Sequence, residues 1–148
     1  MPYSFYFDSE NRIVLVCFDG RVTDELLSEF QRIGARRIVA TMDFRGTIVD
    51  FSDVDSFEVT AETVRTLAWE EPADPDSSRP RVMVAPEDHV FGLCRIFASH
   101  GEDTRPNLHV VRSMEHACAI LSVAEPKFEP IDPFKPTEPN GELDPAAD

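Results

Sequence analysis

An unbroken apolar run at residues 13–18 constrains the fold of this chain more than any other feature. The run reads Ile-Val-Leu-Val-Cys-Phe, and Asp19-Gly20 ends it. A strand that is apolar at every position has both faces covered, as in the parallel sheets of α/β proteins, whereas a half-solvated strand alternates apolar and polar residues. The run therefore predicts a strand inside an α/β sheet that has helices packed against it.

Strand-like and helix-like segments alternate along the chain on either side of this run. Turn-forming residues at 9–11 join it to an earlier strand, as in a hairpin. The predicted strands are 3–8, 12–18, 46–51, 81–85 and 108–111, and the predicted helices run from Thr23 to about 37, then 61–70, 87–99 and from Ser113 to 121. This β-β-α-β-α-β-α-β-α order predicts a single α/β domain over residues 1–123, with a mostly parallel five-stranded sheet.

Residues 124–148 differ in composition from the rest of the chain. They hold six of the twelve prolines, seven acidic residues and two lysines. Proline at this density prevents helix formation and removes ladder donors, so we expect an acidic tail that is disordered or loosely docked. Phe128, Ile131 and Phe134 are spaced to lie along one edge of a polyproline II segment. Such an edge would suit a strap on the domain or a partner-binding motif, while a solubilising tail remains the alternative.

Charge and cysteine content exclude several classes of function. The formal net charge is −14 and the isoelectric point is near 4.5, which disfavours nucleic acid and anionic membranes as partners. The N-terminal residues lack the pattern of a signal peptide, so a cytoplasmic location is expected. Cys17, Cys94 and Cys118 form no close pair, which predicts free thiols and neither a disulfide nor a zinc site. No cofactor is expected, and an edge strand leaves room for a homodimer.

Six short segments follow one another along the body of the chain in a recognisable order. They are Phe18-Asp19-Gly20-Arg21-Val22-Thr23-Asp24, Ile48-Val49-Asp50-Phe51-Ser52-Asp53-Val54, Thr60-Ala61-Glu62, Val84-Ala85-Pro86, Val90-Phe91-Gly92-Leu93 and Val110-Val111-Arg112-Ser113. With this order and spacing, residues 3–122 resemble the SpoIIAA-like proteins, relatives of the STAS domain and more distantly of the CRAL-TRIO lipid-binding fold. The resemblance implies a STAS-like fold and a non-enzymatic regulatory or binding module.

The same resemblance singles out the segment that follows the third predicted strand. In STAS anti-anti-sigma factors this loop reads approximately Asp-Leu-Ser-x-Val-x-x-x-Asp-Ser-Ser-Gly, and its second adjacent Ser is a phosphorylation switch. Thr60 falls at that position here, with Val59 and Ala61 beside it. The resemblance implies a protein-binding loop with Thr60 as its candidate phosphorylation site, built from Ser52, Asp53, Asp55, Ser56, Glu58 and Thr60. A threonine at a helix start is also an ordinary N-cap, which is the simpler interpretation.

Two further functions fit the sequence. The lipid-binding relatives imply a pocket between helices and sheet for a small apolar ligand, near Phe91, Leu93 and Phe97. Acidic residues at a strand end also suit Mg²⁺, so metal-assisted hydrolysis at the loop of Asp50, Asp53, Asp55 and Glu58 is the enzymatic alternative. The sequence designates no catalytic residue and no metal ligand.

Two residues of the helix predicted at 87–99 have alternative interpretations. Cys94 could be a nucleophile with His89 as its base, but Cys94 falls on the inward face of the predicted helix, where a thiol is normally inert. Gly92, inside the same helix, indicates a close approach of helix and sheet, or a gap left for a ligand.

Overall fold

The centre of the molecule is a six-stranded mixed sheet in the order β5-β4-β3-β2-β1-β6. A computed structural model describes residues 2–134 of the chain. The strands are β1 (Tyr3–Asp8), β2 (Ile13–Thr23), β3 (Gly46–Glu58), β4 (Arg81–Val84), β5 (Leu108–Val111) and β6 (Glu129–Ile131). Strands β2 to β5 are parallel, and β1 is antiparallel to both of its neighbours. The predicted α/β class is confirmed, and the sheet has one strand more than the five expected.

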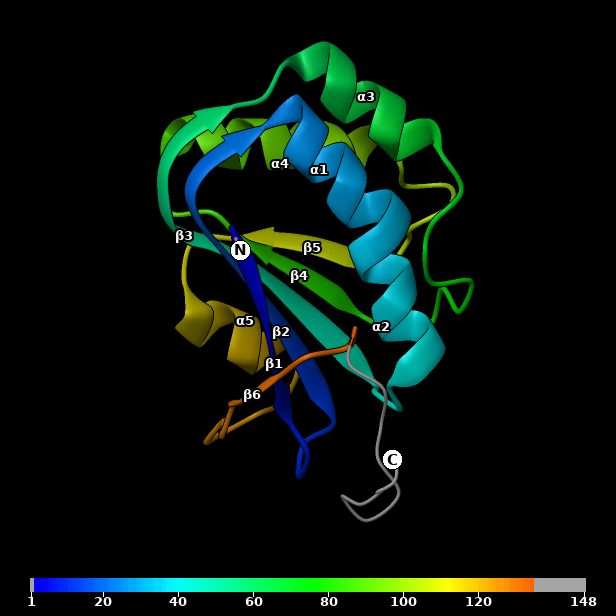
Figure 1. The fold of residues 1–148 in the computed structure, drawn as a ribbon, viewed down its shortest axis with the longest axis vertical. Helices are drawn as coiled ribbons and strands as arrows, with labels where there is room; N and C mark the ends of the chain where they lie inside the picture. The colour runs from blue at the N-terminus through cyan, green and yellow to red at the C-terminus, as the bar shows by residue number, and fades with distance from the viewer. Residues whose placement is uncertain (1, 135–148) are drawn as a thin grey trace, which may run out of the picture.

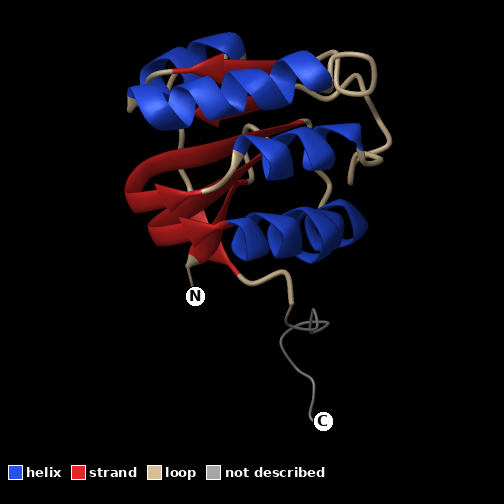
Figure 2. Ribbon diagram, turned by 90° about the horizontal axis from the view of Figure 1, so that it is seen from above, coloured by secondary structure: helices blue, strands red, loops and turns tan. Residues whose placement is uncertain are grey.

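Helices cover the two faces of this sheet unequally (Figures 1 and 2). They are α1 (Asp24–Glu29), the π-helical η1 (Phe30–Gly34), α2 (Ala35–Thr41), α3 (Ala61–Trp69), α4 (Asp88–His100) and α5 (Met114–Ile120). The first three form one continuous helix. Because β2, β3, β4 and β5 succeed one another in one direction across the sheet, right-handed crossovers bring the continuous helix, α3 and α4 to the same face. The segment α5 packs on the opposite face against β4 and β5.

Alternation along the strands divides the buried residues into two clusters. Val14, Val16 and Phe18 of β2 point to the face of the continuous helix, α3 and α4, whereas Ile13 and Leu15 point to the face of α5. The continuous apolar character of this run is thus explained, because both faces of β2 are buried.

The long strands β2 and β3 extend past the rest of the sheet as a two-stranded parallel ribbon. Residues 19–23 of β2 pair with residues 53–58 of β3, with one register shift before this stretch, between Cys17 and Asp19, and one within it, between Gly20 and Arg21. Gly20 has a φ of +68°, a left-handed conformation that glycine adopts without steric cost. In Figure 1 both strands curve beyond the ends of β1 and β4 toward the starts of α1 and α3.

The ribbon corrects the expectation of a loop at residues 52–58. The third strand continues to Glu58 instead of ending at Phe51, because β2 also continues past Phe18 and supplies the backbone partners. The polar composition of this stretch is that of a solvated ribbon, which has little apolar surface to bury.

The segment after α5 returns across the sheet and adds β6 to the free edge of β1. Phe5 pairs with Ile131, and Phe7 pairs with Glu129. Phe128 packs in the α5-side cluster and Ile131 in the other, so these residues do not share one polyproline edge as expected. Arg37 Nε donates to the carbonyl of Pro133 over 2.7 Å. Residues 135–148 of the expected tail lie outside the described residues.

Candidate functional site

Thr60, the candidate phosphorylation site, caps the helix α3. Its hydroxyl accepts from the backbone N–H of Thr63 over 3.1 Å. Asp24, the first residue of α1, accepts from the Thr60 backbone N–H over 2.9 Å and from its hydroxyl over 3.3 Å. The helix starts of α1 and α3 are therefore joined through one threonine. A phosphoryl group on this hydroxyl would replace the cap and face the Asp24 carboxylate.

The acidic residues of the ribbon are engaged separately. Glu58 accepts from Arg21 over 2.8 Å and from the Ser56 hydroxyl over 2.7 Å, and the hydrogen bonds from these two residues lower its pKa to about 2. Asp50 accepts from the backbone N–H and the hydroxyl of Ser52. Within residues 2–134, no three His, Cys, Asp or Glu side chains are placed to hold a metal ion.

An apolar cavity of about 90 Å³ lies between the sheet and the helices of its more covered face. Leu93 and Phe97, two residues of the predicted pocket, line this cavity. Phe91, the third, does not line it, and its ring packs beneath the Arg112 guanidinium, whose Cζ lies 3.9 Å from the ring centroid. The remaining wall comes mainly from apolar residues of β2, β3 and β4 and of the continuous helix, among them Phe18, Val49, Phe51, Met83, Phe30 and Ile38.

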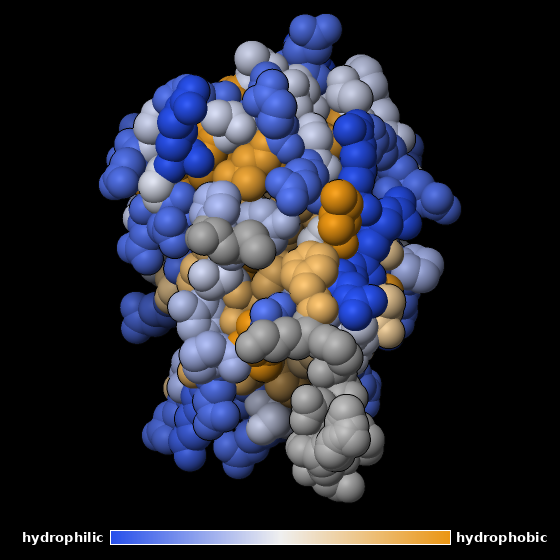
Figure 3. Space-filling view, in the orientation of Figure 1, coloured by the Kyte–Doolittle hydropathy of each residue, from blue (hydrophilic) through white to orange (hydrophobic). Residues whose placement is uncertain are grey.

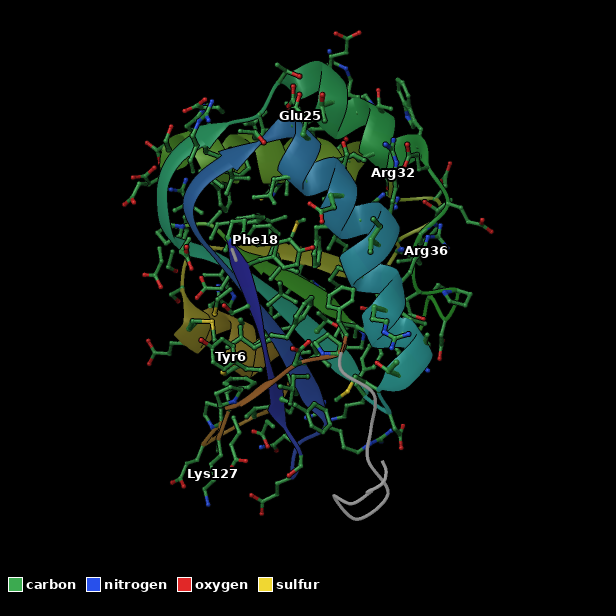
Figure 4. All side chains as sticks on the ribbon, viewed as in Figure 1. Tyr6, Phe18, Glu25, Arg32, Arg36 and Lys127 are labelled. Atoms are coloured by element: carbon green, nitrogen blue, oxygen red, sulfur yellow. The ribbon has the colours of Figure 1, made fainter. Side chains whose placement is uncertain are left out.

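The π-helical turn η1 forms one side of this cavity. Phe30, Gln31 and Ala35 line the cavity from the continuous helix, and Phe18, labelled in Figure 4, lines it from β2. Phe18 and Phe30 are in edge contact, with their ring centroids 5.2 Å apart. Single π-helical turns inside α-helices are frequent at functional sites. The helix that covers the cavity is thus irregular at the cavity itself.

Polar residues gather at the end of the cavity where β3 and β4 begin. Thr47, Asp74 and Arg81 line both the apolar cavity and an adjoining polar pocket of about 30 Å³. The polar pocket continues along the loop at residues 72–80 and to Arg105. A largely apolar cavity with few polar groups at one end is the usual form of a small-molecule site.

The outer surface over this region is mixed. Figure 3 shows hydrophobic residues as separate patches across the middle of the face seen there, with hydrophilic residues around them. Arg32 and Arg36 project from the continuous helix (Figure 4), and Arg32 forms an ion pair with Glu70 at the end of α3. This ion pair joins the two helices outside the cavity.

The pair of Cys94 and His89 has no catalytic geometry. Cys94 lies in the cavity wall, where burial raises the pKa of its thiol to about 12. The His89 Nε2 atom lies 3.2 Å from the carbonyl oxygen of Phe57, on the ribbon. Cys17 is also a poor nucleophile, because burial, and then Asp50, Asp53 and Asp19, raise its pKa to about 11.

The sequence interpretation missed Asp24, Arg21 and Arg81. Asp24 had no recognisable partner because Thr60 is distant in the sequence. For Arg81 a signal did exist, since it is two residues before Met83 on the same strand and therefore faces the same side of the sheet. The close approach of helix and sheet expected at Gly92 is also wrong, because this residue is exposed and a Cβ there would meet nothing within 4 Å.

Comparison of the sequence with protein-family models and with curated proteins finds no match. Among the described residues, no helix has the length and apolar character needed to cross a membrane.

Proposed function

We propose that this protein is a binding module that holds a small apolar group in the cavity between its sheet and its helices. The observation that carries the proposal is the cavity itself, because a largely apolar cavity with a few polar groups is the usual form of a small-molecule site. Its volume of about 90 Å³ compares with about 150 Å³ for an engineered apolar cavity that binds benzene. The apolar group inside the cavity is therefore small, and the rest of a ligand would extend through the open side of the cavity.

The resemblance to SpoIIAA-like and STAS proteins, with their distant lipid-binding relatives, supports the same proposal. We propose a STAS-like topology on the order of the elements and the parallel arrangement of β2 to β5. An experimental structure with a different strand order would exclude that assignment.

Cavity filling tests the ligand proposal. Ala35 lines the cavity, so Ala35→Phe places a ring in it, whereas Ala40→Phe makes the same change at an exposed position of the same helix. We expect hexan-1-ol to raise the melting temperature of the natural chain and of Ala40→Phe, because a ligand that binds only the folded state stabilises it. Ala35→Phe should show no such rise. Equal rises in all three proteins, or none in any, would contradict the proposal.

A second candidate function is protein binding through the ribbon, as the resemblance first implied. The observation that favours protein binding is that residues 53–58 of β3 extend beyond β4, so that β4 supplies no backbone partner to this edge of the strand. The exposed residues Asp53 and Asp55 lie on this part of the strand. Such an edge with acidic side chains suits a basic extended segment.

Charge reversal tests this second candidate. Asp53→Lys with Asp55→Lys should abolish binding of a lysine-rich peptide library to the immobilised chain, whereas Glu115→Lys with Glu102→Lys, away from the ribbon, should leave it unchanged. If both double variants retain the same peptides, the ribbon is not the binding surface.

A further inference from the structure

Arg81 is placed at the junction of the apolar cavity and the polar pocket by the register of the sheet. On β4, Val82 and Val84 are buried on the α5 side, so Arg81 and Met83 face the helices on the other side. Arg81 pairs with Thr47 on β3, and both side chains line the cavity and the polar pocket. A guanidinium and a hydroxyl therefore stand side by side at the polar end of an apolar cavity.

The Arg81 guanidinium has no partner among residues 2–134, although acceptors are near. Asp74 is the carboxylate whose charge acts on the pKa of Arg81. Its oxygens, however, accept from Arg79 over 3.4 Å and from the Asp76 backbone N–H over 3.0 Å. Within the same residues Arg81 forms neither a side-chain hydrogen bond nor an ion pair. Burial lowers the pKa of Arg81, and Asp74 only partly opposes this. Among the described residues, the fully buried side-chain nitrogen without a partner is Arg105 Nε, and the half-buried Arg81 guanidinium remains accessible from the two pockets that it lines.

The neighbouring arginine is already used by the fold. Arg105 Nη1 donates to the carbonyl of Ala68 over 2.8 Å, and Nη2 donates to the carbonyl of Glu70 over 3.2 Å. These bonds satisfy the C-terminal end of α3. Burial, followed by the charge of Arg81, lowers the pKa of Arg105 to about 10. Three arginines (Arg79, Arg81 and Arg105) and two aspartates (Asp74 and Asp76) line the polar pocket, so the charges of its side chains sum to +1, which favours an added anion.

We propose that the ligand of this cavity is a small carboxylic acid, whose carboxylate binds the Arg81 guanidinium and whose short apolar chain fills the cavity. The inference rests on the proposed function, since it assumes that the cavity is occupied. The planar guanidinium presents two parallel N–H donors that match the two oxygens of a carboxylate. The Thr47 hydroxyl, which has no hydrogen bond among the described residues, supplies a further donor on the adjacent strand.

The net charge of the whole chain does not itself attract a carboxylate. A net charge of −14 repels an anion at long range, so a preference for a carboxylate has to come from a local partner. Salt of about 0.15 M limits that repulsion to distances of roughly 8 Å.

Calorimetric titration with hexanoate and hexan-1-ol, at neutral pH and about 0.15 M salt, tests the inference. We expect the natural chain to bind hexanoate at least about tenfold more tightly than hexan-1-ol, because a single hydrogen bond to a charged group already provides about this factor. Arg81→Gln should abolish this preference while it still binds hexan-1-ol. Arg95→Gln removes an exposed arginine outside the cavity and should leave the preference intact.

The possible outcomes separate the two proposals. Equal binding of the two probes by the natural chain, or a preference that survives in Arg81→Gln, would overturn the carboxylate inference and leave the apolar cavity standing. Failure of both probes to bind would overturn both proposals. If Arg81→Gln does not fold, Arg81→Lys tests the inference instead, because a lysine keeps the positive charge but lacks the two parallel N–H donors of the guanidinium. The hexanoate preference should then fall several-fold, and an unchanged preference would overturn the inference.

Discussion

At the scale of single residues, Asp8 links parts of the chain that are far apart in the sequence. Its buried carboxylate accepts from the backbone N–H of Asn11 over 3.0 Å, from the Asn11 side-chain amide over 2.8 Å and from the backbone N–H of Lys127 over 3.0 Å. One side chain therefore closes the β1–β2 turn and holds the segment that leads into β6.

Removal of this carboxylate should destabilise the fold. Asp8→Ala leaves the N–H groups of Asn11 and Lys127 without their acceptor, and we expect a loss of about 3 kcal/mol in the free energy of unfolding, since hydrogen bonds to charged groups are worth about 1.5–3 kcal/mol. Urea denaturation measures it. Glu10→Ala, an exposed acid in the same turn, is the control and should change the value little.

The same residue predicts a pH dependence. Burial raises the pKa of Asp8, but the hydrogen bonds from Asn11, Lys127 and Glu10 outweigh it and hold the pKa below its ordinary 3.8. A depressed folded-state pKa means that the stabilisation is fully present above the unfolded pKa and is lost as the pH falls through the folded value. The difference between the natural chain and Asp8→Ala should be constant at neutral pH and shrink below pH 3.8. A difference that grows toward acid would contradict this assignment.

Residue-scale prediction from the sequence succeeded for local contacts and failed for distant ones. Thr60 and Ser113 were expected to begin helices, and both cap them, because a cap depends on the next three residues. The bonds of Asp24 to Thr60 and of Asp8 to Lys127 span the chain, and no local pattern reveals them.

At the scale of elements, the first helix differs most from its expected form. The sequence predicts a helix from Thr23 to about residue 37, whereas the helix continues to Thr41 and contains the π-helical η1. Gly34 ends η1, and its backbone packs against Phe30 and Tyr3. Gly34 lacks the Cβ that would crowd Tyr3 of β1, and such a contact between elements cannot be read from the helical periodicity of the sequence.

Two glycine substitutions test this interpretation of η1. A Cβ on Gly34 would lie 3.0 Å from Phe30 Cδ1 and 3.2 Å from the Tyr3 hydroxyl oxygen, whereas one on Gly92 would meet nothing within 4 Å. Gly92→Ala should therefore raise the free energy of unfolding by about 1 kcal/mol, the usual helical gain of alanine over glycine. Gly34→Ala should lower it, as measured by thermal or urea denaturation. An equal rise in the free energy of unfolding for both variants would mean that η1 accommodates a Cβ at Gly34 without cost, and would contradict this interpretation.

At the scale of the whole molecule, the sequence predicted the α/β class because strand-like and helix-like periods alternate in a fixed order. The strands at 3–8 and 108–111 have the expected bounds, and the helices at 61–70 and 87–99 agree within one residue at each end. The strand β6 was missed because its proline-rich sequence carries no strand pattern. Its pairing depends on the edge that β1 leaves free, and covering an edge is a property of the assembled sheet.

The cavity is likewise a property of the assembled molecule. Much of its apolar wall, including Phe18, Val49 and Leu93, belongs to strands and helices that the sequence predicts, whereas Phe44, Phe57 and Ala73 lie outside them, and only the packing of the layers leaves space between these residues. Leu93 and Phe97 were expected in such a pocket from the resemblance to lipid-binding relatives. The strand alternation indicates which face of the sheet Arg81 lies on, but its place beside Thr47 at the polar end follows only from the register of β3 and β4.

The most direct test of the occupied cavity is the methyl NMR spectrum of the chain labelled with [methyl-¹³C]methionine. Met83 lines the cavity, whereas Met114 packs in the cluster on the opposite face of the sheet and serves as an internal control. Hexan-1-ol should shift the Met83 resonance in a saturable manner and leave the Met114 resonance in place. A Met83 resonance that does not move, or one that moves only together with that of Met114, would contradict the account.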